Sequence, residues 1–390
     1  MPQRLIDFDY QQRTRIVFGE NSIDTLGEHA AKQGGSRVLL VTDRGIAAAG
    51  HAERGRRSLS SAGLEVFLFE GVHENPTSHD VDDCAAFARE AEIDLIVGLG
   101  GGSSMDTAKG CNFILTNAGT MEDYWGYGKA KEPMLPLIAV PTTAGTGSEC
   151  QSYALISHPE THQKMACGDR KAAACVAILD PVLTLTQPES VTADTGIDAL
   201  AHAVETAVTT KRTPLSALHS KEAFRLIQAN LPLVFKNPTD LDARSGMLLG
   251  AAYGGMAIEN SMLGAAHACA NPLTSRYGIV HGEAVGMMLP AVMRFNAAEE
   301  VSRQTYCELA QTAGLVEKGA AGEEGSEAFI GCIDSLLCLG NIPKRLCDHG
   351  ITSDAIPNLA TDAGEQWTGK FNPRTLTVED FQGLYESVLR

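Results

Sequence analysis

The feature that most constrains the fold is a short apolar run that ends in a cluster of glycines. Residues 94–98 read Asp-Leu-Ile-Val-Gly, and four of the five positions 98–102 are glycine. The run predicts a strand that is apolar on both faces, which is typical of a parallel sheet covered by helices. A helix-forming segment follows the glycines and continues beyond Asn112.

Strand-like and helix-like segments alternate through the first half of the chain, so this strand is not isolated. Such an order predicts an α/β fold built on a parallel sheet. The expected strands are residues 16–19, 37–42, 65–69, 94–98, 137–140 and 176–181, and the expected helices include 22–33 and 78–92.

The glycine cluster is also a candidate ligand site. Consecutive glycines let the backbone approach a ligand closely, and the amides at a helix N-terminus favour a phosphate. A tight turn between strand and helix is the alternative, but a turn does not need four glycines. The spacing differs from GxGxxG, and the cluster lies outside the first strand–helix unit, so the common dinucleotide-binding pattern is not matched.

A different pattern in the second half indicates a metal site. Residues 196–205 are mostly small and apolar and predict a helix, on which Asp198 and His202 share one face. A carboxylate and an imidazole placed in this way suit a divalent transition metal, although a local hydrogen bond is the alternative. His267 and His281 also lie among small and apolar residues, where an uncharged imidazole needs a partner, and they favour the metal.

Several motifs together resemble those of the iron-containing (group III) alcohol dehydrogenases, over roughly residues 15–296. Residues 196–205 and 264–290 are similar to the two metal motifs of that family. The glycine cluster resembles the GGGS phosphate loop that the family shares with dehydroquinate synthases, and residues 141–149, Pro-Thr-Thr-Ala-Gly-Thr-Gly-Ser-Glu, match a family motif almost letter for letter. The resemblance implies that one Fe²⁺ ion, or Zn²⁺ in its place, is bound by Asp198, His202, His267 and His281.

The resemblance also implies NAD(P) as the cofactor. Asp43 stands at the end of an expected strand, where a carboxylate can accept hydrogen bonds from a ribose and repel a 2′-phosphate, so we expect NAD. A helix cap is the alternative for Asp43, a plain turn for Asn75 and a surface charge for Lys164. The expected cofactor contacts are Asp43, Asn75, Gly100, Gly101, Gly102, Ser103, Asp106, Thr142, Thr143, Thr146, Lys164 and Leu179.

The character of the chain changes at residues 187–190, Gln-Pro-Glu-Ser, after which few β-rich runs occur. We therefore expect an α/β NAD-binding domain at residues 1–186 and an all-helical metal-binding domain at residues 187–390. The expected helices of the second domain are residues 216–228, 243–260, 282–296, 299–313, 326–339 and 378–389.

The predicted function is an NAD-linked alcohol dehydrogenase, or an aldehyde reductase in the other direction, that acts on a small primary alcohol or aldehyde. The metal would act as a Lewis acid on the substrate oxygen, and hydride would pass to or from the nicotinamide. Many family members have a second histidine where this chain has Asn271. An amide cannot titrate, so we expect Asn271 to orient substrate or cofactor.

Three alternatives keep part of this interpretation: a dehydroquinate synthase-like lyase, a glycerol-type polyol dehydrogenase on the same fold, and a non-enzymatic nucleotide-binding protein. A phosphorylated substrate would need Lys and Arg, whereas residues 265–270 around His267 are Ala and Cys. Four intact metal positions argue against a protein without catalysis.

Composition excludes several other partners. The net charge of −17 over 390 residues argues against nucleic acid and anionic membrane surfaces. No apolar run reaches the length of a membrane span, and the N-terminus has no apolar signal core. Ten cysteines without a CxxC pair fit the reducing cytoplasm. Finally, the resemblance implies a homodimer or a higher homo-oligomer.

Overall fold

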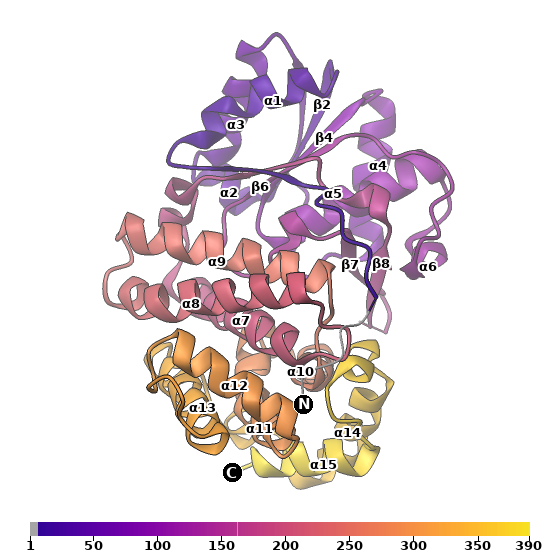
Figure 1. Ribbon diagram of the computed structural model, residues 1–390. Helices are drawn as coiled ribbons and strands as arrows, with labels where there is room; N and C mark the ends of the chain where they lie inside the picture. The colour runs from indigo at the N-terminus through magenta and orange to yellow at the C-terminus, as the bar shows by residue number, and fades with distance from the viewer. Residues whose placement is uncertain (1–6, 162) are drawn as a thin grey trace. The chain divides into compact units, whose positions relative to one another are not determined.

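The protein divides into two compact units in a computed structural model that describes residues 7–161 and 163–390 (Figure 1). One unit is Gln11–Gln187, and the other is Pro188–Arg390 together with the described residues before Gln11. Tyr10 stacks on His219 of the second unit, with ring centroids 6.4 Å apart. The chain therefore changes unit between residues 187 and 188, and the segment just before Gln11 joins the second unit.

The first unit is built on a six-stranded parallel sheet, as the alternating pattern predicted. The strand order is β1-β9-β6-β4-β2-β3. Every residue of β4 is buried, because parallel neighbours lie on both sides and helices lie over both faces. The strands are β1 (Arg15–Phe18), β2 (Arg37–Val41), β3 (Glu65–Phe69), β4 (Leu95–Gly100), β6 (Leu137–Pro141) and β9 (Val176–Leu179).

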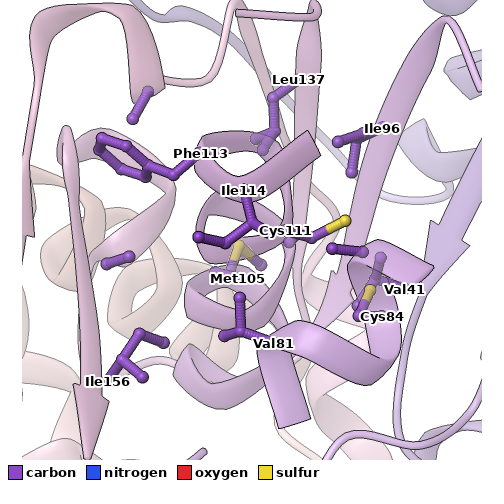
Figure 2. Close-up of a cluster of buried hydrophobic side chains, with 14 of the residues drawn as sticks. Val41, Val81, Cys84, Ile96, Met105, Cys111, Phe113, Ile114, Leu137 and Ile156 are labelled. Carbon is purple, nitrogen blue, oxygen red and sulfur yellow. The ribbon is translucent and has the colours of Figure 1, made fainter. Parts of the chain in front are cut away.

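Two separate hydrophobic clusters cover the two faces of this sheet. Because side chains alternate along a strand, Val38 and Leu40 of β2 belong to one cluster and Leu39 and Val41 to the other. The first cluster is completed by η1 (Ser22–Thr25), α1 (Leu26–Lys32) and α3 (His51–Ser61). The second is completed by α4 (Ser78–Glu90) and α5 (Gly102–Asn117), whose side chains meet those of the strands in Figure 2.

Some elements of this unit were not expected from the sequence. A second sheet of order β5-β8-β7 is formed by short strands, of which β5 has only 2 residues. The helix α3 was missed because its sequence, His-Ala-Glu-Arg-Gly-Arg-Arg-Ser-Leu-Ser-Ser, is dominated by polar residues. The other missed elements are α2 (Arg44–Ala48), α6 (Met121–Tyr124), β5 (Gly126–Tyr127), β7 (Tyr153–Ser157) and β8 (Lys164–Gly168).

The second unit is helical, as predicted. Its first helix, α7, is almost completely buried, and α8, α9 and α11 pack against it. Side chains of Thr213, Asp240 and Thr377 cap the starts of α8, α9 and α15. The helices are α7 (Glu189–Val208), α8 (Pro214–Lys236), α9 (Leu241–Glu259), α10 (Ala265–Tyr277), α11 (His281–Ala297), α12 (Glu300–Thr312), α13 (Gly322–Leu339), α14 (Ile356–Glu365) and α15 (Val378–Ser387).

In the part of the chain that the structure describes, none of the helices combines the length and the apolar character needed to cross a membrane.

Candidate active site

Three histidines surround one carboxylate in the helical unit. The Oδ1 atom of Asp198 lies 3.3 Å from Nε2 of His202, 3.3 Å from Nε2 of His267 and 3.8 Å from Nε2 of His281. Ligand atoms of Asp198, His267 and His281 all lie within 4.8 Å of one another. The structure thus brings together the four residues that the sequence proposed as metal ligands, although they come from three helices.

Each helix presents its ligand for a local reason. Asp198 and His202 lie one turn apart on α7, so their side chains share a face. His267 is in the first turn of α10, and His281 is the first residue of α11. The two helices are joined by a short turn in which Gly278 adopts φ 66°, a left-handed conformation that favours glycine.

A glycine next to His281 allows α11 to touch α7. A Cβ atom added at Gly282 would lie 2.0 Å from the carbonyl oxygen of Asp194, which is backbone and cannot move aside alone. Only glycine lets the start of α11 come this close to α7. This approach places His281 beside Asp198, one turn further along α7.

The cluster is buried and strongly polarised. Burial alone would favour the neutral acid at Asp198, but the three imidazoles outweigh burial and hold its pKa well below the usual range. Burial lowers the pKa of His267, but the carboxylates of Glu205 and Asp198 raise it by more than burial lowers it, and the net pKa is about 9. A carboxylate with three imidazoles is a ligand set suited to Fe²⁺ or Zn²⁺.

Glu205 is a residue of this site that the sequence reasoning missed. Its Oε2 accepts a hydrogen bond from Nδ1 of His267 at 2.5 Å, and its Oε1 accepts one from the backbone N–H of Ala266 at 2.7 Å. The signal was available in the spacing, because Glu205 follows Asp198 by seven residues and His202 by three, and so lies on the same face of α7.

Asn271 lies one turn after His267 on α10, as its sequence position requires. Its Nδ2 donates a hydrogen bond to Oε1 of Gln366, at the end of α14, at 3.0 Å. The structure therefore gives the Asn271 amide a partner within the helical unit. Its expected role toward substrate or cofactor stays a prediction.

In the α/β unit, two loops that follow neighbouring strands meet. After β4, a Cβ atom added at Gly102 would lie 2.7 Å from Cγ2 of Thr146, and one at Gly101 would lie 3.5 Å from Cγ2 of Thr143. Thr142 donates its N–H to the carbonyl oxygen of Gly100 at 2.9 Å. The glycine cluster and the threonine-rich loop after β6 therefore form one continuous backbone surface.

Asp43 adjoins the same surface. A Cβ atom added at Gly100, which has φ 151°, would lie 3.6 Å from Oδ2 of Asp43 and 2.3 Å from Oγ of Ser104. Oδ1 of Asp43 accepts a hydrogen bond from the N–H of Ile46 at 2.9 Å and caps α2. The cap that was the alternative interpretation is thus present, and it uses only one of the two carboxylate oxygens.

Three other expected cofactor residues have ordinary structural positions. Asn75 adopts φ 51° in the turn before α4, which fits the simple turn interpretation. Leu179 ends β9 and is fully buried. Lys164 begins β8 and is half-buried, so it is not the fully exposed surface charge that the residue alone suggested.

Asp106 belongs to the interior and holds the two loops together. Its carboxylate accepts a hydrogen bond from Oγ of Ser148 at 2.8 Å, and burial raises its pKa despite the nearby Lys109. Nζ of Lys109 donates to the carbonyl oxygen of Ser148 at 2.6 Å and to that of Tyr153 at 2.9 Å. Lys109 and Ser148, which the sequence analysis did not single out, thus attach the threonine-rich loop to α5.

Comparison with known proteins decides the family. One family model, iron-containing alcohol dehydrogenase, matches residues 13–181, and a second, Fe-containing alcohol dehydrogenase family, C-terminal, matches residues 192–389. The chain belongs to the iron-containing alcohol dehydrogenase family. The resemblance inferred from the motifs is therefore confirmed over nearly the whole chain, including its C-terminal helices.

Curated and structural relatives of this alcohol dehydrogenase agree with the assignment. It is 33% identical to the 1,3-propanediol dehydrogenase of Klebsiella pneumoniae over 97% of this chain and 98% of the relative. It is 31% identical to the NAD-dependent methanol dehydrogenase of Bacillus methanolicus over 96% and 97%. The crystal structure of a 1,3-propanediol oxidoreductase superposes with a TM-score of 0.95 at 32% identity, covering 98% and 100% of the two chains. The predicted class of enzyme and the fold are confirmed, and the lyase and polyol alternatives are not favoured.

Replacing Gly282 with Ala tests the close approach of α11 to α7. The added methyl group would collide with the Asp194 backbone, so we expect Gly282→Ala to lower the free energy of unfolding by about 1–3 kcal/mol, as overpacking does. Gly331 on α13, where an added Cβ meets nothing within 4 Å, provides the matched control. Thermal unfolding of both variants checks this, and equal midpoints would show that the contact is not tight.

The metal-free enzyme should hold a proton that a metal ion must displace. The pKa of His267 lies at about 9, so its imidazole is protonated below that pH and neutral above it. Metal binding near pH 7 should therefore release about one proton from His267, and binding at about pH 10 should release none from it. Calorimetric titration with Zn²⁺ in buffers of different ionisation enthalpy measures this number, and a value that does not change with pH would contradict the assignment.

Proposed function

We propose that this enzyme catalyses the reversible, NAD-linked oxidation of a small uncharged primary alcohol to its aldehyde, at a divalent metal held by Asp198, His202, His267 and His281. The observation that carries the proposal is the convergence of three imidazole Nε2 atoms on Oδ1 of one buried carboxylate, at 3.3–3.8 Å. A cation is the ligand that such a cluster fits, and the family supplies the reaction class.

When bound, the ion would act as a Lewis acid on the substrate oxygen. The protein's own contribution is to hold the ligand set in place before the ion arrives. Asp198 is ionised across the physiological pH range because its pKa is depressed, so the site carries the negative charge that a divalent cation needs. His202 and His267 stack with ring centroids 5.0 Å apart, which limits the movement of both rings.

The joined glycine and threonine loops are the proposed binding surface for the NAD diphosphate. The start of α5 lacks a side-chain cap at Gly101, so its first amides are available to phosphate oxygens. Because Gly101 and Gly102 have no side chains, Thr143 and Thr146 can lie against this backbone and contribute to the same proposed surface. Ser103, Thr143 and Thr146 are proposed to add hydroxyl groups around the diphosphate, and Lys164 to lie near the nicotinamide ribose. Thr142 is only 2% exposed, so its expected contact with the cofactor would have to come from its backbone.

Iron is the metal we propose, because the family that the chain belongs to is defined by iron. The ligand types would also accept zinc. Metal analysis of protein purified without oxygen or chelators, followed by reconstitution with each ion, separates the two.

The substrate is proposed to be short and uncharged on the strength of the relatives. These relatives include a 1,3-propanediol dehydrogenase and a methanol dehydrogenase, whose alcohols are small. The small residues around His267 do not indicate the size of the substrate, because residues 265–270 are fully or almost fully buried within α10 and pack against protein. Their small size serves helix packing.

Two further proposals concern the setting of the enzyme. We propose a cytoplasmic location, supported by the cysteines of the described residues, which form no disulfide and most of which are buried. We also propose a homodimer or a higher homo-oligomer, which rests on the family resemblance and is measured directly by light scattering.

Removing a ligand should abolish the metal and the activity together. In His202→Ala, one imidazole is lost from the cluster, and we expect bound metal and kcat/KM to fall by more than the ~10–100-fold that outer-shell changes cost. His219→Ala is the control, because His219 lies on α8 and stacks with Tyr10 and Tyr253. Elemental analysis and NAD reduction with short alcohols measure both effects, and a His202→Ala protein with full metal content and turnover would refute the ligand assignment.

The charge of Asp43 should determine the preference for NAD. Asp43→Ser keeps a side chain able to cap α2 but removes the charge that repels a 2′-phosphate, so we expect the ratio of kcat/KM for NAD to that for NADP to fall, with little change in thermal stability. Wild-type protein that prefers NADPH to NADH, or an unchanged ratio in Asp43→Ser, would show that Asp43 serves only as a cap.

A further inference from the structure

The carboxylate of Glu205 joins two helices of the metal centre at its most buried point. Glu205 is only 4% exposed, and both of its oxygens accept hydrogen bonds from the first turn of α10, one from the His267 ring and one from the Ala266 backbone. A Cβ atom added at Gly264 would lie 3.0 Å from Oε1, so the carboxylate packs directly against the residue that begins the turn.

The start of α10 depends on side chains from elsewhere in the unit. Gly264, at its N-cap position, has no side chain to accept a hydrogen bond from the first amides. The N–H of Ala265 donates a hydrogen bond to Oδ1 of Asn372 at 3.3 Å, and the N–H of Ala266 donates one to Oε1 of Glu205. These two residues therefore satisfy amides that a helix start leaves open, and the negative charge of Glu205 suits the positive end of the helix dipole.

Glu205 also binds the imidazole ring of His267, whereas Asn372 contacts the backbone of Ala265. A carboxylate accepts hydrogen bonds, so the ring nitrogen facing it, Nδ1, carries the proton. The other nitrogen, Nε2, which faces Oδ1 of Asp198 at 3.3 Å, is therefore the one whose lone pair becomes available once a metal ion displaces its proton. The hydrogen bond thus selects the tautomer that can bind a metal and holds the ring in that direction.

We propose that Glu205 is a positioning residue of the metal centre, which fixes the tautomer and orientation of His267 through Nδ1. The inference rests on the proposed metal site and adds a residue to it. The single helix α7 then supplies two ligands, Asp198 and His202, and orients a third that belongs to α10. The hydrogen bond also ties the start of α10 to α7, so the ligand set is assembled before the ion binds.

The test uses the full-length protein and Zn²⁺ as the probe, in competition with a chromophoric chelator. Glu205→Gln keeps the shape of the side chain but has one acceptor oxygen, which cannot serve both Ala266 and His267, and its NH₂ group favours the wrong tautomer. We expect Zn²⁺ affinity to fall by ~10–100-fold, the range for lost outer-shell partners. With Co²⁺ as the probe, the visible absorption bands should also change, because the ligand field of His267 changes.

Asn372→Ala provides the matched control, since Asn372 binds the same helix start but contacts the backbone of Ala265 instead of the imidazole. It should unfold at a lower temperature, yet retain a Zn²⁺ affinity within about threefold of wild type, short of the outer-shell range. An equal loss of affinity in Asn372→Ala and Glu205→Gln would overturn the proposal, because Glu205 would then act only as a helix cap. Wild-type affinity and an unchanged Co²⁺ spectrum in Glu205→Gln would overturn it as well.

A second variant covers the case in which Glu205→Gln does not fold. Glu205→Asp keeps the carboxylate but is shorter by one methylene group, so it cannot reach both donors, and we expect weaker Zn²⁺ binding. Wild-type affinity in Glu205→Asp would count against the proposal in the same way.

These measurements also separate the inference from the proposed function. Zn²⁺ affinity does not require turnover, so wild-type protein that binds metal but does not oxidise alcohols with NAD would refute the proposed reaction, while the variants still decide the role of Glu205. Wild-type protein that binds no metal would overturn both.

Discussion

The buried carboxylate of Asp198 is the constraint on which the helical unit depends. An ionised carboxylate that leaves water loses several kcal/mol of solvation unless partners replace the water. Asp198 obtains those partners from three imidazoles on α7, α10 and α11, and one of them, His267, is held in turn by Glu205. The helices α10 and α11 must therefore lie at a closely defined distance from α7. Gly264 and Gly282 stand at two positions where they approach α7 closely.

The α/β unit solves a comparable problem around its two loops. The surface that we propose for the diphosphate would need accessible backbone amides, and a backbone of this kind has few side chains to stabilise it. The support comes from underneath, where Lys109, Asp106 and Ser148 form a buried hydrogen-bonded group between α5 and the threonine-rich loop. Because all three are paired, they hold the threonine-rich loop in place against α5.

In both units, buried hydrogen bonds support the helices and loops that carry the residues expected to contact ligands. This arrangement explains why Asp106, which the motif suggested as a cofactor contact, lies in the interior. It also explains why the small residues around His267 pack within the protein.

The sequence by itself determined the fold class, the family and the four candidate metal ligands that the structure brings together. Parallel strands with both faces apolar, a glycine cluster before a helix and an Asp-x-x-x-His pair depend on local periodicity and backbone conformation, which neighbouring residues decide. The polar helix α3 and the short strands β5, β7 and β8 were missed. The helix lacks an apolar pattern of its own, and the three strands depend on pairing with one another, β7 with β8 and β8 with β5. Tertiary structure also decided that Glu205 holds His267, that Lys109 and Ser148 support the loops, and that Asn271 binds Gln366. Each of these contacts joins residues far apart in the chain. Local spacing could place Glu205 on the metal face of α7, but the partner on another element follows only from the tertiary packing.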